Sequence, residues 1–174
     1  MKVVQPGAHL DHLLRQTRVH HVQLSSMADI KANMLLTLSA VVITVMAPHV
    51  MKPALRWAAL VLIVFCLATV VLAVYAVMPK VPLRAGDRVV DPRSRTFNLL
   101  FFGDFMQMSY DEFEGAMEKV LNDPSEAYQV QVREIYTLGV FLARKKYRVL
   151  KMAYLTFLAG LLTSATVFAC LELL

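Results

Sequence analysis

The chain has 174 residues, and it is too apolar and too poor in charge for an ordinary soluble domain. Hydrophobic residues make up 57% of it and charged residues 18%, with a net charge of +5, whereas soluble domains are about 45–50% apolar and about 25% charged. This composition excludes a secreted disulfide mini-protein, a disordered tail and most soluble enzymes, and it predicts a membrane protein. Cys66 and Cys170 lie in apolar runs, so we expect packed thiols there and no disulfide or metal pair.

Residues 1–31 are the first predicted segment, a helix on the cytosolic side of the membrane. No glycine or proline follows Gly7 in this segment, and apolar residues such as Leu10, Leu13 and Leu24 recur at helical spacing. We therefore expect this helix to run directly into the first membrane span.

The first two spans are predicted over residues 32–48 and 57–78. The second run contains no charged residue, and a helix of about 20 apolar residues crosses a hydrocarbon core about 30 Å thick. The first run contains polar residues but no charge, and its Ser and Thr side chains can hydrogen-bond to their own helix backbone. Only a short turn containing Pro48 and Pro53 separates the spans. Residues 32–78 are therefore predicted to form an antiparallel hairpin.

Residues 79–151 are predicted to be a second cytosolic segment that is mostly helical. The prolines and the Gly-Asp step between residues 79 and 95 predict a loop that carries basic residues over the membrane surface. Ser109 precedes several acidic residues, which is typical of a helix N-cap. We expect that helix to end near Asn122.

The third span is predicted over residues 152–171, which contain no charged residue. Before this span, the sequence Asp123-Pro124-Ser125 predicts the start of a new helix, and no proline follows it. We therefore expect one continuous helix from about Ser125 through the third span.

The distribution of Lys and Arg predicts the orientation. Sixteen of the 18 basic residues lie before the first span or between the second and third, and only Lys52 and Arg56 lie near the short turn. Basic residues concentrate on the cytoplasmic side of membrane proteins. We therefore expect a multi-pass inner-membrane protein with a cytoplasmic N-terminus and a periplasmic C-terminus, and no nucleic-acid partner.

The predicted fold is an all-α integral membrane protein with three transmembrane helices and a small helical cytosolic bundle, whose long helix continues into the third span. The sequence contains no glycine-rich phosphate loop and no nucleophile elbow, so we expect no enzyme, no catalytic residue and no cofactor. Four histidines lie near the N-terminus, but no cysteine or paired carboxylate joins them, so we expect no metal site. These are His9, His12, His20 and His21.

Two short stretches are candidates for a ligand site. Asp29 and Lys31 lie at the start of the first span, where charges are costly unless they are paired or exposed. One interpretation is an interfacial helix whose Lys31 extends toward water. The other is that both residues contact the basic cluster before the third span, or a ligand held between them.

The sequence Asn98-Leu99-Leu100-Phe101-Phe102-Gly103-Asp104-Phe105 is unusual for a cytosolic loop, because its phenylalanines need burial. One interpretation is an edge that packs into the helical bundle. The other is the wall of a nucleotide pocket, in which an aromatic face stacks on a base and an amide contacts its edge. Arg133, Lys145 and Lys146 would then bind a phosphate.

Three motifs resemble those of the transmembrane effectors of the pyrimidine-cyclase antiphage system, the PycTM family of Pycsar effectors. They are Ala28-Asp29-Ile30-Lys31-Ala32 at the first span, Asn98-Leu99-Leu100-Phe101-Phe102-Gly103 in the middle, and Lys145-Lys146-Tyr147-Arg148 before the last span. The resemblance covers residues 20–170. It implies a partner cyclase that makes cyclic UMP or cyclic CMP, and an effector that responds by impairing the inner membrane, so that growth stops before phage are released.

A nucleotide-gated, membrane-impairing effector is therefore one hypothesis, and three spans are too few to line a pore alone, so it implies a homo-oligomer. The alternative is a structural or adaptor membrane protein whose cytosolic helices recruit a partner. The predicted nucleotide contacts, which come from the residues and not from the resemblance, are Asp29, Lys31, Asn98, Phe102, Arg133, Lys145 and Lys146.

Overall fold

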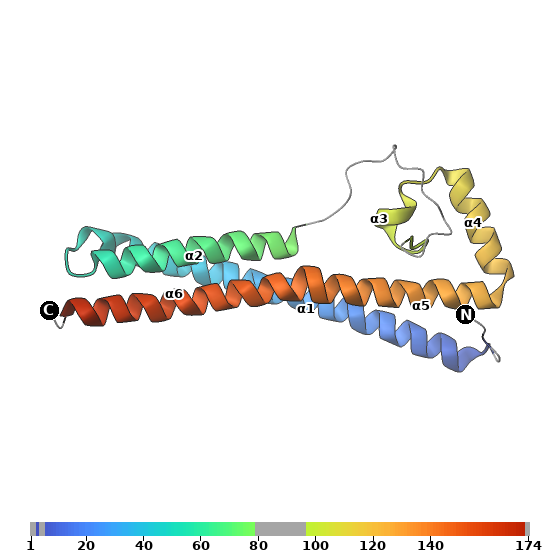
Figure 1. Cartoon of the computed structure of the whole chain (residues 1–174), viewed down its shortest axis with the longest axis horizontal. Helices are drawn as coiled ribbons and strands as arrows, with labels where there is room; N and C mark the ends of the chain where they lie inside the picture. Colours follow the sequence, from blue (N-terminus) through green and yellow to red (C-terminus); the bar gives the residue numbers. More distant parts are fainter. Residues whose placement is uncertain (1–2, 4–5, 79–96, 173–174) are drawn as a thin grey trace. The chain divides into compact units, whose positions relative to one another are not determined.

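The computed structural model of the chain describes residue 3 and residues 6–78 and 97–172 (Figure 1). Within these residues all regular secondary structure is helical, and three of the helices are long and apolar enough to cross a membrane. The all-α fold with three membrane helices is thus confirmed. The predicted basic loop over residues 79–95 lies outside the described residues.

The chain divides into two compact units. The first unit comprises Met1–Gln23 and Pro79–Phe141, and the second unit comprises Leu24–Met78 and Leu142–Leu174.

The N-terminal helix does run into the first predicted span, because α1 extends from Ala8 to Met46. It ends two residues before the predicted boundary at residue 48 and is followed by a short 3₁₀ turn, η1 (Ala47–Met51), whose second residue is Pro48. Proline lacks the N–H that would continue an α-helix, which explains the boundary. The second span follows as α2, Arg56–Val77.

The long C-terminal helix differs from its prediction in one respect. It begins at Pro124 and continues to Glu172, as predicted to within one residue. However, a π-helical segment, η2 (Leu142–Tyr147), separates α5 (Pro124–Phe141) from α6 (Arg148–Glu172). A π-helix accommodates extra residues in the turn and often marks a functional position.

Small residues allow the helices of the second unit to pack closely. Gly160 of α6 lies against Phe65 of α2, and a Cβ at position 160 would overlap the Cβ of Phe65. The Ser164 hydroxyl donates a hydrogen bond to the Ala58 carbonyl, 2.9 Å away, so that α2 and α6 lie side by side (Figure 1). Small residues and interhelical hydrogen bonds are what membrane helices use for association.

The opposite faces of these helices are apolar and exposed. Met34, Val64, Val71 and Leu162 are each more than 60% exposed. Exposed apolar faces of this kind promote aggregation in water, whereas in a membrane they contact lipid chains.

In the first unit, α3 (Phe102–Phe105) and α4 (Tyr110–Asn122) precede α5. Ser109 is the N-cap of α4 and Asn122 its last residue, so both sequence predictions for this helix are confirmed. Asp123 then turns the chain, and its carboxylate accepts a hydrogen bond from the Ser125 N–H at 2.8 Å.

Candidate functional site

The first unit contains a groove of about 780 Å³ between α4, α5 and the segment before α3. Cavities of about 300–1,000 Å³ are the usual size for small-ligand sites. The groove has an apolar part and a charged part. Phe97, Leu99 and Met108 belong to the apolar part, Asp111, Glu112, Lys119, Glu126 and Arg133 to the charged part, and Gly115, Ala116, Val120, Gln129 and Val130 complete the lining.

A capping box fixes the beginning of α4 beside this groove. The Ser109 hydroxyl accepts a hydrogen bond from the Glu112 N–H at 3.3 Å, and the Glu112 carboxylate accepts one from the Ser109 N–H at 2.8 Å. The Ser109 N–H and the Ser109 hydroxyl both donate to the Glu112 carboxylate, and these two hydrogen bonds lower the pKa of Glu112 because they stabilise its charged form. From this start, Asp111, Gly115 and Lys119 are spaced four residues apart, which places them in one row along the helix.

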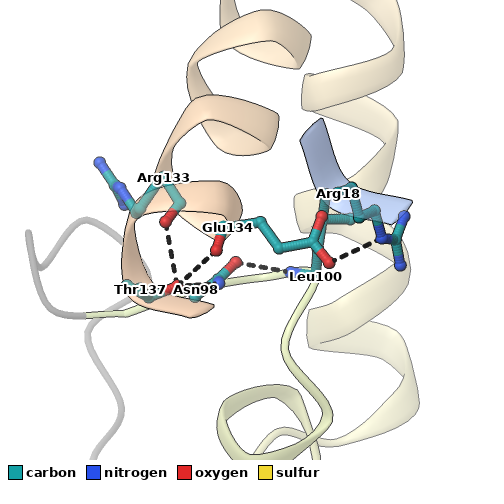
Figure 2. A network of polar contacts seen from close by, with 6 residues as sticks. All are labelled: Arg18, Asn98, Leu100, Arg133, Glu134 and Thr137. Atoms are coloured by element: carbon teal, nitrogen blue, oxygen red, sulfur yellow. Dashed lines mark hydrogen bonds and ion pairs between the residues drawn. The ribbon is translucent and has the colours of Figure 1, made fainter. Parts of the chain in front are cut away.

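Asn98 fixes the segment that forms the apolar part (Figure 2). Its side-chain amide donates to the Thr137 hydroxyl at 2.9 Å, and its side-chain carbonyl accepts from the Leu100 N–H at 3.1 Å. Only 1% of Asn98 is exposed. Because a buried amide without partners is costly, this residue determines where Phe97 and Leu99 lie.

Arg133 joins α5 to the same segment. Its guanidinium donates from Nη1 to the Phe97 carbonyl at 3.0 Å. Its own carbonyl accepts from the Thr137 hydroxyl at 2.9 Å, which is the contact drawn in Figure 2. Arg133 is therefore both part of the groove lining and part of its support.

An ion pair attaches α1 to α5 within the first unit. Arg18 Nε lies 3.1 Å from the Glu134 carboxylate (Figure 2), and Glu134 is 8% exposed. Burial raises the pKa of Glu134, and the positive charge of Arg18 opposes this rise. The Tyr128 hydroxyl also donates to the Asp11 carboxylate at 2.6 Å, which raises the pKa of Tyr128.

The second unit has its own polar cluster, centred on Lys146 in η2. The Lys146 ammonium donates to both carboxylate oxygens of Asp29 at 2.7 Å and to the Ser25 hydroxyl at 2.8 Å. Beside it, the Tyr147 hydroxyl donates to the Leu24 carbonyl at 3.0 Å. The π-helical segment therefore supplies two side chains that bind α1 within this unit. A Lys ammonium has three donors, so Lys146 can bind a phosphate only by giving up part of its contacts with Asp29 and Ser25.

The structure divides the predicted nucleotide contacts between the two units. Asn98 and Arg133 belong to the first unit, and Asp29, Lys31, Lys145 and Lys146 belong to the second. Phe102 begins α3, but its side chain lies outside the described part of the structure. Contact of any of these residues with a ligand stays a prediction.

Several of the residues predicted to contact the nucleotide form contacts within the protein, which favours structural roles for them. The Asn98 amide is committed to Thr137 and Leu100, as the packed-edge interpretation of its segment expects. The predicted contact between Asp29 and the basic cluster is present as the ion pair with Lys146. The Lys31 carbonyl accepts a hydrogen bond from the Tyr154 hydroxyl at 3.3 Å.

Sequence reasoning did not single out most residues of the groove lining, and Gly115, Lys119 and Gln129 are among those it missed. The four-residue spacing of Asp111, Gly115 and Lys119 was a usable signal, because residues at this spacing share a helix face. What the sequence did not indicate is that this face looks onto a cavity and not onto open solvent.

Comparison with known proteins gives one family. No curated protein and no solved structure matched the chain. Residues 12–171 match the family model of the Pycsar effector protein domain, PycTM. The match covers both units and all three membrane helices. With nearly the whole chain inside this match, the protein belongs to the PycTM family of Pycsar effectors.

Proposed function

We propose that this Pycsar antiphage effector responds to a cyclic pyrimidine mononucleotide, cyclic UMP or cyclic CMP, made by a partner cyclase. In response it impairs the integrity of the inner membrane, and the infected cell stops growing before phage are released. The observation that carries the proposal is membership of the PycTM family over residues 12–171. The three membrane helices agree with an effector that acts on a bilayer.

If the membrane is impaired through a pore, the pore needs more than one copy of the chain. Three membrane helices that pack against one another through small residues leave no lumen, so a pore requires a homo-oligomer. We place the N-terminus in the cytoplasm and the C-terminus in the periplasm, because 16 of the 18 basic residues then lie on the cytoplasmic side. The first unit would then be exposed to a nucleotide made in the cytoplasm.

The sensing part of the proposal uses the continuity of the helices. α1 begins in the first unit and ends in the second, and α5, η2 and α6 likewise form one helical run through both. A ligand shifts a conformational equilibrium only if it binds one state more tightly than the other. A nucleotide that favours one packing of the first unit would therefore act directly on the helices that enter the membrane.

The test is depolarisation of cells that express the chain together with a pyrimidine cyclase. A membrane-potential dye should report depolarisation when the cyclase is active, and none when its catalytic residues are removed or when it makes a purine cyclic nucleotide. Vesicles containing the purified chain should release an enclosed dye on addition of cyclic UMP or cyclic CMP, but not of cyclic AMP. Leakage that ignores every nucleotide would contradict gating, and intact membranes with an active cyclase would contradict the proposed membrane damage.

A further inference from the structure

Gly115, in the middle of α4, has no packing reason to be glycine. A Cβ built on it would meet no atom within 4 Å, whereas at Gly160 it would overlap a neighbouring side chain. Gly115 lies within a regular α-helix, where glycine is unfavourable compared with alanine. Gly115 lines the groove. The missing side chain therefore leaves space in the groove that the protein itself does not fill.

The charges around this space suit a small ligand that is anionic at one part and rich in hydrogen-bond donors at another. Lys119 lies one turn after Gly115 and forms no ion pair among the described residues, and Arg133 lines the groove from α5. Asp111 and Glu126 add carboxylates to the same lining. A polyanion such as a nucleic acid would be repelled by these acids, but a singly charged phosphodiester with hydroxyl and N–H donors would find partners for both.

We propose that the groove between α4 and α5 binds the cyclic pyrimidine mononucleotide. This inference rests on the proposed function, which supplies the ligand class. Lys119 and Arg133 bind the cyclic phosphodiester. The carboxylates accept hydrogen bonds from the ribose 2′-hydroxyl and from N–H groups of the base. The planar base packs against the apolar part formed by Phe97, Leu99 and Met108.

The glycine provides a test that fills the groove without disturbing the fold. Gly115→Leu places a side chain in the space beside Lys119, and leucine is a good helix former, so the variant should be as thermally stable as the original chain or more so. We expect its affinity for cyclic UMP and cyclic CMP, measured by calorimetry on the full chain in detergent, to fall at least tenfold. Gly115→Ala is the matched control. It gains helix propensity but fills little of the groove, so it should bind within about threefold of the original chain.

A second pair of variants tests the charge. Lys119→Gln should weaken binding by about tenfold, the loss expected for one charged hydrogen bond. Glu118→Gln, at the neighbouring exposed position that does not line the groove, should not weaken it.

The outcomes separate this inference from the proposed function. If the original chain binds neither nucleotide and vesicles do not respond, the proposed ligand is wrong and the groove assignment is wrong with it. If the original chain binds and Gly115→Leu binds equally well, the groove is not the site but the proposed function stands. Loss of binding by Gly115→Leu and Lys119→Gln, with retention by Gly115→Ala and Glu118→Gln, supports the groove.

Discussion

The two units hold their helices together by different means. In the first unit, polar side chains cross between elements, as in the contacts of Asn98 with Thr137 and of Arg18 with Glu134. In the second unit, small residues such as Gly160 bring helix backbones close, and side chains such as Lys146 and Ser164 add polar cross-links. The difference follows the solvent. In water, buried polar networks specify one packing of a small core, whereas in lipid no hydrophobic drive joins the helices and close packing must do so.

Two helical glycines give the sharpest contrast between the units. Gly160 contacts Phe65, whereas Gly115 has open space beside it. We predict that Gly160→Leu forces α2 and α6 apart and lowers the free energy of unfolding of the second unit by about 3 kcal/mol, the upper part of the range for overpacking. Trp57, the single tryptophan of the chain, lies in α2, so its fluorescence during thermal unfolding in detergent reports on this unit.

The control for this change is Thr163→Leu, on an exposed face of the same helix. It should leave the unfolding temperature unchanged, because a lipid-facing leucine is favourable. If Gly160→Leu unfolds with the original chain, the two helices do not depend on the close contact and the contrast between the units disappears.

In the first unit the largest loss should come from a polar side chain. Asn98→Ala leaves the Leu100 N–H and the Thr137 hydroxyl without the partner they now have. Loss of buried hydrogen-bond partners costs about 1–3 kcal/mol, so we predict faster hydrogen exchange in α5 and in the segment at Leu99, measured by mass spectrometry on the full chain. Asn122→Ala, at the exposed end of α4, is the control and should leave exchange in α5 unchanged.

These cases show how far the sequence specifies the structure. The membrane helices and α4 are predictable because their signals are local. Runs without charge define the spans, and Ser109 with Glu112 defines a helix start within four residues. The burial of Asn98 is not predictable in this way, because the partner that satisfies its amide, Thr137, is 39 positions away.

The sequence did not predict the π-helical segment or the groove either, because both depend on residues that are distant along the chain. The residue types of Leu142–Tyr147 are compatible with an ordinary α-helix. The contacts of Lys146 in this segment are with residues of α1 more than 100 positions earlier. Likewise, Gly115 in isolation is only a weak point in a helix. Its meaning depends on what α5 and the segment at Phe97 place opposite it.

The ion pair of the second unit should contribute less than its short distances suggest. The Asp29 side chain is 41% exposed, so water screens its interaction with Lys146, whose side chain is 14% exposed. We predict that Asp29→Asn lowers the free energy of unfolding by about 1 kcal/mol. In a double-mutant cycle with Lys146→Met, the coupling should be of the same size. Additive losses in Trp57 unfolding would show that the pair contributes nothing beyond its separate parts.

The smallest effect that we predict is a pH dependence in the first unit. Burial raises the pKa of Glu134 in the folded chain above its ordinary value, which is about 4.3. The folded state then retains a proton that the unfolded state has lost, so stability is greatest below this ordinary value and falls as the pH rises through the folded pKa. Glu134→Gln removes the titration. Above the folded pKa this variant no longer has a buried charge, but it also loses the ionic contact with Arg18 at 3.1 Å, so the two effects partly cancel.

We therefore expect hydrogen exchange in α5, corrected for intrinsic chemistry, to accelerate between pH 4 and pH 7 in the original chain by more than in Glu134→Gln. Arg18→Gln should enlarge the acceleration, because it removes the charge that opposes the effect of burial. An acceleration that is the same in all three proteins would mean that Glu134 titrates in the folded unit as it does in the unfolded chain.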